Sequence, residues 1–175
     1  MRPWVAYVFI ISIIVACSCW IVTAQAANDL PTVNLNVSNA GPRQVEDTTE
    51  KALERDYARA WNTMETALAQ NRADVLDADF VGVALDELKS RVSEQARSGL
   101  HTRYVDHGHN LQAVFYSPEG SAVQLQDTAQ LEVQYLDGDK ILRSEQRTET
   151  YTVVMTAGEN RWKVRVLQAT PAQPE

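Results

Sequence analysis

The sequence predicts an α+β domain in which one long helix is clasped by a curved antiparallel sheet. Large apolar residues recur from Leu53 to Leu68 in steps of four, four, three and four, the spacing of one helical face. From about Leu111 to Leu167 the pattern changes to the alternation typical of strands. With 175 residues, 45% of them hydrophobic and 22% charged, the chain has room for one such domain and a terminal extension.

The N-terminal extension is apolar. From Trp4 to Ala24 a run of 21 residues contains no charged side chain. As a helix it would span roughly 32 Å, close to the roughly 30 Å core of a bilayer. The run therefore predicts a membrane anchor through residues 4–24. Arg2 and the amino terminus favour a cytoplasmic N-terminus, which predicts a single-pass protein of the inner or cytoplasmic membrane with its domain on the extracytoplasmic side.

Two cleavage signals compete with the anchor. Ala24-Gln25-Ala26 before Ala27 has the small-x-small form of a signal peptidase site, and cleavage there would give a secreted or periplasmic domain. Ile14 to Cys17 also resembles a bacterial lipoprotein signal, although Trp20-Ile21-Val22 continues the apolar run beyond the cysteine. We place the uncleaved anchor first, the cleaved signal peptide second and lipidation third. All three export the domain.

The cysteines and the net charge limit the folded part. Cys17 and Cys19 both lie in the apolar run, so the domain contains no disulfide. Without Arg2, 15 Lys+Arg stand against 23 Asp+Glu, a net charge of −8. Nucleic acid is therefore not an expected partner, because binding phosphate backbones needs a basic surface.

The chain divides into four segments: an anchor or signal peptide over 1–27, a linker over 28–45, an α+β domain over 46–169 and a tail over 170–175. The linker contains Pro31, Gly41 and Pro42. Its short apolar alternation, Val33 to Val37, is more typical of an extended tether than of a strand, although it could add to a sheet edge.

Three helices are expected before the sheet. The first begins between Gln44 and Thr48 and ends near Asn71, and a short helical piece follows over residues 73–80. The third ends at Gly99, a typical helix stop, and carries one apolar face made of Val81, Leu85, Leu88, Val92 and Ala96.

Strand patterns follow Gly99, separated by turn residues. Gly108 and Asn110 indicate a turn, Ser117 to Gly120 a second, and Asp137-Gly138-Asp139 the turn of a hairpin. The expected strands are Tyr104–Val105, Asn110–Ser117, Val123–Tyr135, Ile141–Thr156 and Arg161–Val166.

This order of helices followed by long strands resembles the nuclear-transport-factor-2-like superfamily, also called SnoaL-like or ketosteroid-isomerase-like. The resemblance covers about Thr49 to Gln168 and is carried by Tyr57 to Leu68, Leu76 to Leu88 and Arg161 to Val166. Within the superfamily the chain looks most like non-enzymatic, membrane-tethered members, including the intermembrane-space domain of plastid-division proteins. The resemblance implies a cone-shaped, cystatin-like fold with a pocket at its open end. Members use that pocket for catalysis, for ligand binding or for nothing, so the fold does not settle function.

The candidate pocket residues are Tyr57, Trp61, Tyr116 and Asp127. Asp127 is the one acidic residue on an apolar strand face, and burial would raise its pKa and suit it to proton transfer. We expect instead that a bulge near Gln126 to Thr128 turns it outward or to a wet rim. In enzymatic relatives tyrosines bind ligand oxygens, as Tyr57 could, but a tyrosine at this spacing is more often core.

Asp106, His107 and His109 form the only cluster with metal-like chemistry, since a carboxylate and two imidazoles can ligate zinc. No fourth ligand of known spacing accompanies them. We therefore predict no metal and no cofactor.

These observations predict an exported, membrane-tethered, non-catalytic binding or scaffolding domain of the cell envelope. Its expected partners are the membrane, an envelope protein and a small apolar ligand. The alternative is a small isomerase- or dehydratase-like enzyme using Asp127 and Tyr57. If both side chains point into one closed pocket, the enzyme is favoured, whereas an outward Asp127 or a filled cone favours the binding domain.

Overall fold

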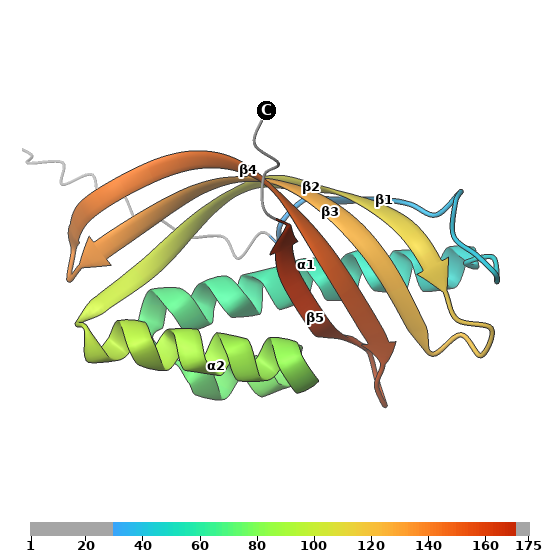
Figure 1. The fold of residues 1–175 in the computed structure, drawn as a ribbon, viewed down its shortest axis with the longest axis horizontal. Coiled ribbons are helices and arrows are strands. Elements are labelled where there is room, and N and C mark those ends of the chain that lie inside the picture. Colours follow the sequence, from blue (N-terminus) through green and yellow to red (C-terminus); the bar gives the residue numbers. More distant parts are fainter. Residues whose placement is uncertain (1–29, 171–175) are drawn as a thin grey trace, which may run out of the picture.

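A computed structural model describes residues 30–170, in which a curved five-stranded sheet covers two helices (Figure 1). The elements are β1 (Val33–Asn36), α1 (Asp47–Gln70), the 3₁₀ helix η1 (Ala73–Ala78), α2 (Gly82–Arg97), β2 (Leu100–Tyr116), β3 (Ala122–Asp137), β4 (Lys140–Ala157) and β5 (Trp162–Thr170). The predicted α+β class, with helices before the antiparallel sheet, is confirmed. The predicted anchor or signal peptide and residues 171–175 lie outside the described range. Among residues 30–170, no helix has the length and apolar character needed to cross a bilayer.

Helix α1 buries the face that its apolar spacing predicts, from Leu53 through Trp61 to Leu68. The same face also carries Asp56, which is fully buried and whose Oδ2 accepts the backbone N–H of Trp162 at 2.9 Å. This carboxylate therefore fastens the start of β5 to the helix. The helix ends at Gln70 and is followed by its C-cap, Asn71, whose backbone is left-handed with φ 53°, as is common after a helix.

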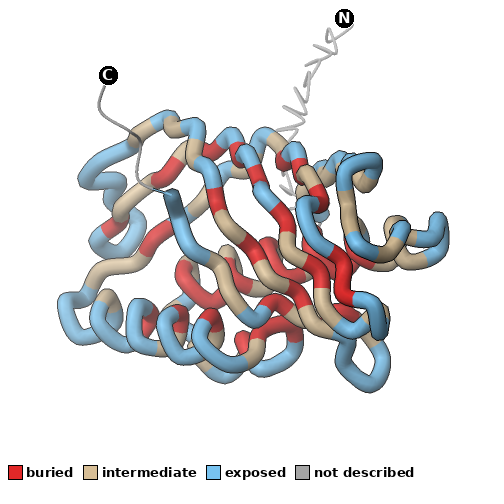
Figure 2. The backbone as a smooth tube through the Cα atoms, turned by 45° about the vertical axis from the view of Figure 1, so that its right-hand side comes forward, coloured by how far each residue is buried: buried red, intermediate tan, exposed pale blue. Residues whose placement is uncertain are grey.

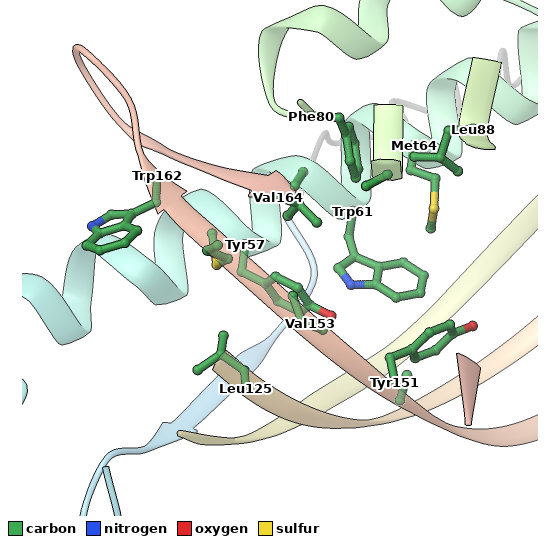
Figure 3. Packing of buried hydrophobic residues seen from close by; sticks show 14 of the residues in the cluster. Tyr57, Trp61, Met64, Phe80, Leu88, Leu125, Tyr151, Val153, Trp162 and Val164 are labelled. Atoms are coloured by element: carbon green, nitrogen blue, oxygen red, sulfur yellow. The ribbon is translucent and has the colours of Figure 1, made fainter. Parts of the chain in front are cut away.

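Strands β2 to β5 form an antiparallel meander, with buried and exposed residues alternating along them (Figure 2). The apolar residues of the inner face meet α1 and α2, as strand alternation requires. In the core, the Trp61 indole packs edge-on against Tyr151, with ring centroids 5.5 Å apart, and Figure 3 shows both side chains converging between helix and sheet.

The predicted division of β2 into two short strands with a turn at Gly108 is wrong. Residues 100–116 form one strand, and the register to β3 shifts between Asp106 and Gly108, so that His107 is an extra residue. Gly108 has φ 123°, which side-chain-bearing residues rarely adopt, so the glycine permits a bulge here rather than a turn. The bulge reverses the alternation, so Asp106 and His109 both face inward.

The expectation that the linker's apolar alternation, Val33 to Val37, forms an extended tether rather than a strand is wrong. Residues Val33–Asn36 form β1, which pairs in parallel with β2 from His109 to Gln112. The N–H of Leu35 donates to Glu54 Oε1 of α1 at 3.1 Å, and the N–H of His109 donates to the Thr32 carbonyl at 2.9 Å. The segment is thus the edge strand of the sheet, the alternative that its apolar alternation also allowed.

Candidate functional site

Asp127 faces the interior, contrary to the expectation that a bulge turns it outward. Its side chain is 0% exposed, and it pairs in regular register with Leu111 on one side and Tyr151 on the other. The bulge expected near Gln126 to Thr128 is absent, and the register shift lies instead on the neighbouring strand, between Asp106 and Gly108. Because β3 stays regular through Asp127, the alternation of its side chains carries the carboxylate inward with Leu125 and Ala129.

Asp127 belongs to a chain of buried hydrogen bonds. Its Oδ2 accepts the Tyr57 hydroxyl at 2.8 Å and lies 2.7 Å from Nδ1 of His109. The other ring nitrogen of His109, Nε2, lies 2.6 Å from Asp106 Oδ2. His109 is fully buried, whereas the Asp106 side chain is 9% exposed. The network therefore runs from the core, at Tyr57, to the edge of the protein, at Asp106.

The bulge and the strand register together assemble this network. Asp127 is opposite Leu111, so His109, two residues earlier on the same face of β2, becomes its diagonal neighbour. Asp106 joins because the extra residue at the bulge brings it to the same face. Sequence reasoning weighed Asp127 and Tyr57 together but treated His109 only as a metal candidate. In one strand, residues 109, 111 and 113 lie on the same face, and because Leu111 and Ala113 are apolar, this spacing could have predicted that His109 faces the core.

The electrostatics favour a charged imidazole between the carboxylates. Burial of His109 disfavours its charged form, but the hydrogen bonds and charges of Asp106 and Asp127 outweigh it and raise its pKa to about 9. At neutral pH both ring nitrogens therefore donate, one to each carboxylate. Burial, with the Asp127 charge adding to it, raises the pKa of Tyr57 well above its ordinary value, so its hydroxyl stays protonated and donates.

Glu65 extends the acidic part of the site, and the sequence analysis did not single it out. It lies on α1 one turn after Trp61 and is partly buried. Burial, reinforced by the charge of Asp106 and opposed by that of His109, raises the pKa of Glu65 to about 7. The site therefore contains a carboxyl group that changes charge near neutral pH.

The network is enclosed by aromatic rings. The Trp61 ring lies over His109 with centroids 4.4 Å apart, and Tyr57 meets His109 edge-on at 5.6 Å. Oδ1 of Asp127 has no hydrogen-bond partner among the described residues. Chemically, the network can hold a proton between two carboxylates, but general acid–base catalysis would also need a substrate within hydrogen-bond reach of Asp127.

The other predicted site residues lie apart from this network or cover it. Trp61 is 1% exposed and is part of the covering layer. Tyr116 lies elsewhere, packed against Trp162 with ring centroids 6.4 Å apart. Of the three metal candidates, Asp106 and His109 contact each other, while His107 is exposed at the bulge. Among residues 30–170, no group of three or more His, Cys, Asp or Glu side chains is arranged to hold a metal ion.

A cavity of about 220 Å³ opens between α2 and the sheet. Its apolar wall includes Met64 and Leu88, and none of the four predicted pocket residues lines it. Polar groups surround it: Arg91 donates to the Tyr104 hydroxyl at 2.7 Å, and Arg147 donates to Glu149 at 3.1 Å. The polar and aromatic lining consists of Glu87, Arg91, Tyr104, Tyr135, Arg147, Glu149 and Tyr151.

This chain is similar to known proteins in structure but not detectably in sequence. No protein-family model matches the sequence. No curated protein matches it either. The intermembrane-space region of the chloroplast protein ARC6 is similar to 73% of this chain and 98% of its own, with 18% identity and a TM-score of 0.60.

Two further solved structures are similar at lower scores. A candidate dehydratase of the NTF2-like family from Streptomyces avermitilis matches 69% of this chain and 97% of its own, at 10% identity and a TM-score of 0.45. A protein of unknown function with a cystatin-like fold from Nostoc punctiforme matches 70% and 96%, at 10% identity and a TM-score of 0.42. The resemblance expected from the sequence is confirmed at the level of fold, which this chain shares with the ARC6 region.

Proposed function

We propose that this chain is an exported, membrane-tethered, non-catalytic domain that binds a protein partner in the cell envelope. The proposal that the domain is not catalytic rests on the hydrogen bonding of His109. Both ring nitrogens of this buried imidazole are committed to carboxylates, and aromatic rings cover it. The imidazole therefore joins β2 to β3, and Asp127 in turn joins both strands to α1 through the Tyr57 hydroxyl.

Binding to a partner is assigned to the cavity between α2 and the sheet. Its volume of about 220 Å³ lies below the roughly 300–1,000 Å³ of typical small-molecule pockets. A space of this size suits one or two side chains of a protein partner, anchored in an apolar pocket with a polar rim. Glu87 and Arg91 line the cavity from α2, and Arg147 and Glu149 line it from β4, so its polar groups can pair with charges of either sign.

The cavity assignment is tested by blocking its wall. Ala169 lines the cavity from the exposed end of β5, so Ala169→Trp would fill it without disturbing the core. The neighbouring Gln168→Trp adds the same bulk on the other face of the strand. After cross-linking in intact membranes, a partner recovered with the original chain and with Gln168→Trp should be lost with Ala169→Trp. Equal recovery with both variants would rule out the cavity as the binding site.

Tethering is assigned to residues 4–24. Only residues 25–32 separate that apolar run from β1, so an anchored domain would lie close to the bilayer. After a high-salt wash the full-length chain should stay with the membranes, since the apolar run and not the acidic domain would hold it there. Recovery in the soluble fraction with Ala27 as first residue would establish a cleaved signal peptide instead.

A second candidate function is a small isomerase- or dehydratase-like enzyme. The contact of Tyr57 and His109 with Asp127, together with the unpartnered Oδ1 of that carboxylate among the described residues, is the observation that favours it. An apolar ketone that reaches Asp127 should raise the melting midpoint of the original chain more than that of Asp127→Asn. Equal shifts for the two proteins, or no shift, would argue against this function.

A further inference from the structure

Strand β4 has one unpaired edge along its first half. Strand β5 pairs with β4 only from Thr150 onward, where Thr170 is its last partner. Within residues 30–170, the segment Lys140–Glu149 therefore has β3 as its only neighbour. In Figure 1 the hairpin of β3 and β4 extends past the end of β5. Along this edge, backbone N–H and C=O groups are open to another strand.

The charges along this edge are arranged symmetrically about Gln146, with opposite signs on its two sides. From Arg143 to Glu149 the sequence reads Arg-Ser-Glu-Gln-Arg-Thr-Glu, with Gln146 at its centre. Positions equally distant from Gln146 carry opposite charges: Arg143 matches Glu149, and Glu145 matches Arg147. All four charged side chains have odd numbers, so strand alternation places them on one face. The segment is therefore electrostatically complementary to itself when it is reversed.

We propose that the free edge of β4 pairs with the same edge of a second copy of this chain, antiparallel and centred on Gln146. A two-fold axis through Gln146 would bring each Arg143 opposite the second copy's Glu149 and each Glu145 opposite the second copy's Arg147. Opposite charges at facing positions stabilise an antiparallel pair. The two five-stranded sheets then become one continuous sheet.

The charge order selects this register over its neighbours. Centring the pair on Glu145 would set Arg143 against Arg147, and centring it on Arg147 would set Glu145 against Glu149. Like charges at facing positions destabilise a pair of strands. Charges on an edge strand generally prevent pairing with unrelated strands. In β4 the order of the charges disfavours unrelated strands and shifted registers. The same order favours pairing with a second copy of the chain.

Within one chain these side chains already form ion pairs along the strand. Arg143 and Arg147 both contact Glu145, and Arg147 also lies 3.1 Å from Glu149. These contacts hold the four side chains in alternating order on one face. Beyond the paired segment, Ile141 and Leu142 are 47% and 51% exposed. In the dimer these two side chains would approach the end of the second copy's β5 and lose contact with water.

Disulfide cross-linking at the two-fold axis tests the pairing. In the full-length chain with Cys17→Ser and Cys19→Ser, Gln146→Cys would face its own copy at a Cα distance suited to a disulfide. Mild oxidation of cells should therefore give a covalent dimer. Gln126→Cys, also exposed on the outer face but on β3, is the matched control. A dimer yield no higher than that of the control would overturn the proposal.

Charge reversal tests the register. Arg143→Glu places two like-charged pairs in the dimer and should reduce the cross-linked fraction about tenfold. Adding Glu149→Arg restores opposite charges across the interface and should restore the cross-linked fraction. Thermal melting of both variants checks that the domain itself remains folded. No loss with the single variant, or no recovery with the double variant, would overturn this register.

The same cross-linking experiment distinguishes a second copy from other segments or proteins that could cover the free edge of β4. If residues 171–175 cover it, the Gln146→Cys dimer should form only after these residues are deleted. If a different protein covers it, the oxidised product should differ in mass from two copies of the chain. Either result would overturn the proposal. We expect a product of two copies whose yield is unchanged by the deletion.

Discussion

His109 and Asp127 form a buried ion pair in which Nδ1 of the ring lies 2.7 Å from Oδ2 of the carboxylate. A second carboxylate, Asp106, holds the opposite ring nitrogen at 2.6 Å. A single positive charge on the imidazole therefore serves two acceptors on two strands. This arrangement links the stability of the sheet to pH.

Stability should fall as pH rises through the titration of His109. The folded pKa of about 9 lies above the ordinary value of 6.5, so the folded state binds the proton more tightly than the unfolded state. The stabilisation is fully present below about pH 6.5 and is lost toward pH 9, with a change on the order of 3 kcal/mol. Urea unfolding from about pH 6 to about pH 9.5 measures it.

The control for this prediction is His107→Gln, which removes an exposed histidine of the same strand and should leave the pH dependence unchanged. Ring-proton NMR then assigns the titration to His109. A His109 titration near its ordinary value would contradict the ion pair with Asp106 and Asp127.

Asp127→Asn should destabilise the domain at neutral pH by about 3 kcal/mol, the range found when one partner of a buried ion pair is removed. The substitution keeps the shape of the side chain but leaves the charged ring of His109 with one carboxylate instead of two. Above about pH 9 the loss should shrink, because His109 is then neutral. Asp139→Asn, in the exposed hairpin turn, is the control. Stabilisation by Asp127→Asn at neutral pH would instead favour the enzyme.

Glu65→Gln should stabilise the domain in mild alkali. Burial raises the folded pKa of Glu65 to about 7 from the ordinary 4.5, so its ionisation costs folded-state stability as pH rises between these values. Allowing for partial exposure, the gain at about pH 8 should be about 1 to 2 kcal/mol, with no gain below about pH 4.5. Denaturant unfolding at both pH values measures it. Glu119→Gln, at an exposed turn, should show neither effect, and a gain equal at both pH values would exclude titration of Glu65 as the cause.

Trp61→Ala should cost on the order of 3–5 kcal/mol, because it opens a cavity beneath Tyr151 and uncovers His109. Nε1 of Trp61 has no hydrogen-bond partner among the described residues, so Trp61→Phe should cost less. Val83→Ala, on the exposed face of α2, serves as the control and should stay within about 0.5 kcal/mol. Chemical denaturation gives all three values. An unchanged midpoint for Trp61→Ala would mean that the indole is not part of the core.

The periodicity of side chains was enough to predict the elements and their buried faces. The apolar spacing from Leu53 to Leu68 and the alternation from Val123 to Tyr135 are local patterns that follow from the geometry of helices and strands. The class, the order of elements and the resemblance in fold could therefore be predicted. The division of β2 could not, because Gly108 serves turns and bulges equally well, and only pairing with β3 distinguishes them.

The site was decided by tertiary structure. Asp127 and Tyr57 could be named from the sequence, but whether they meet depends on how deep α1 lies beneath the sheet. Their contact with His109 depends on the register of β2 against β3, and the inclusion of Asp106 depends on one extra residue at the bulge. A shift of one residue reverses the face of every later side chain in a strand. Local sequence therefore specifies which residues can be buried, whereas the pairing of distant strands decides which of them touch.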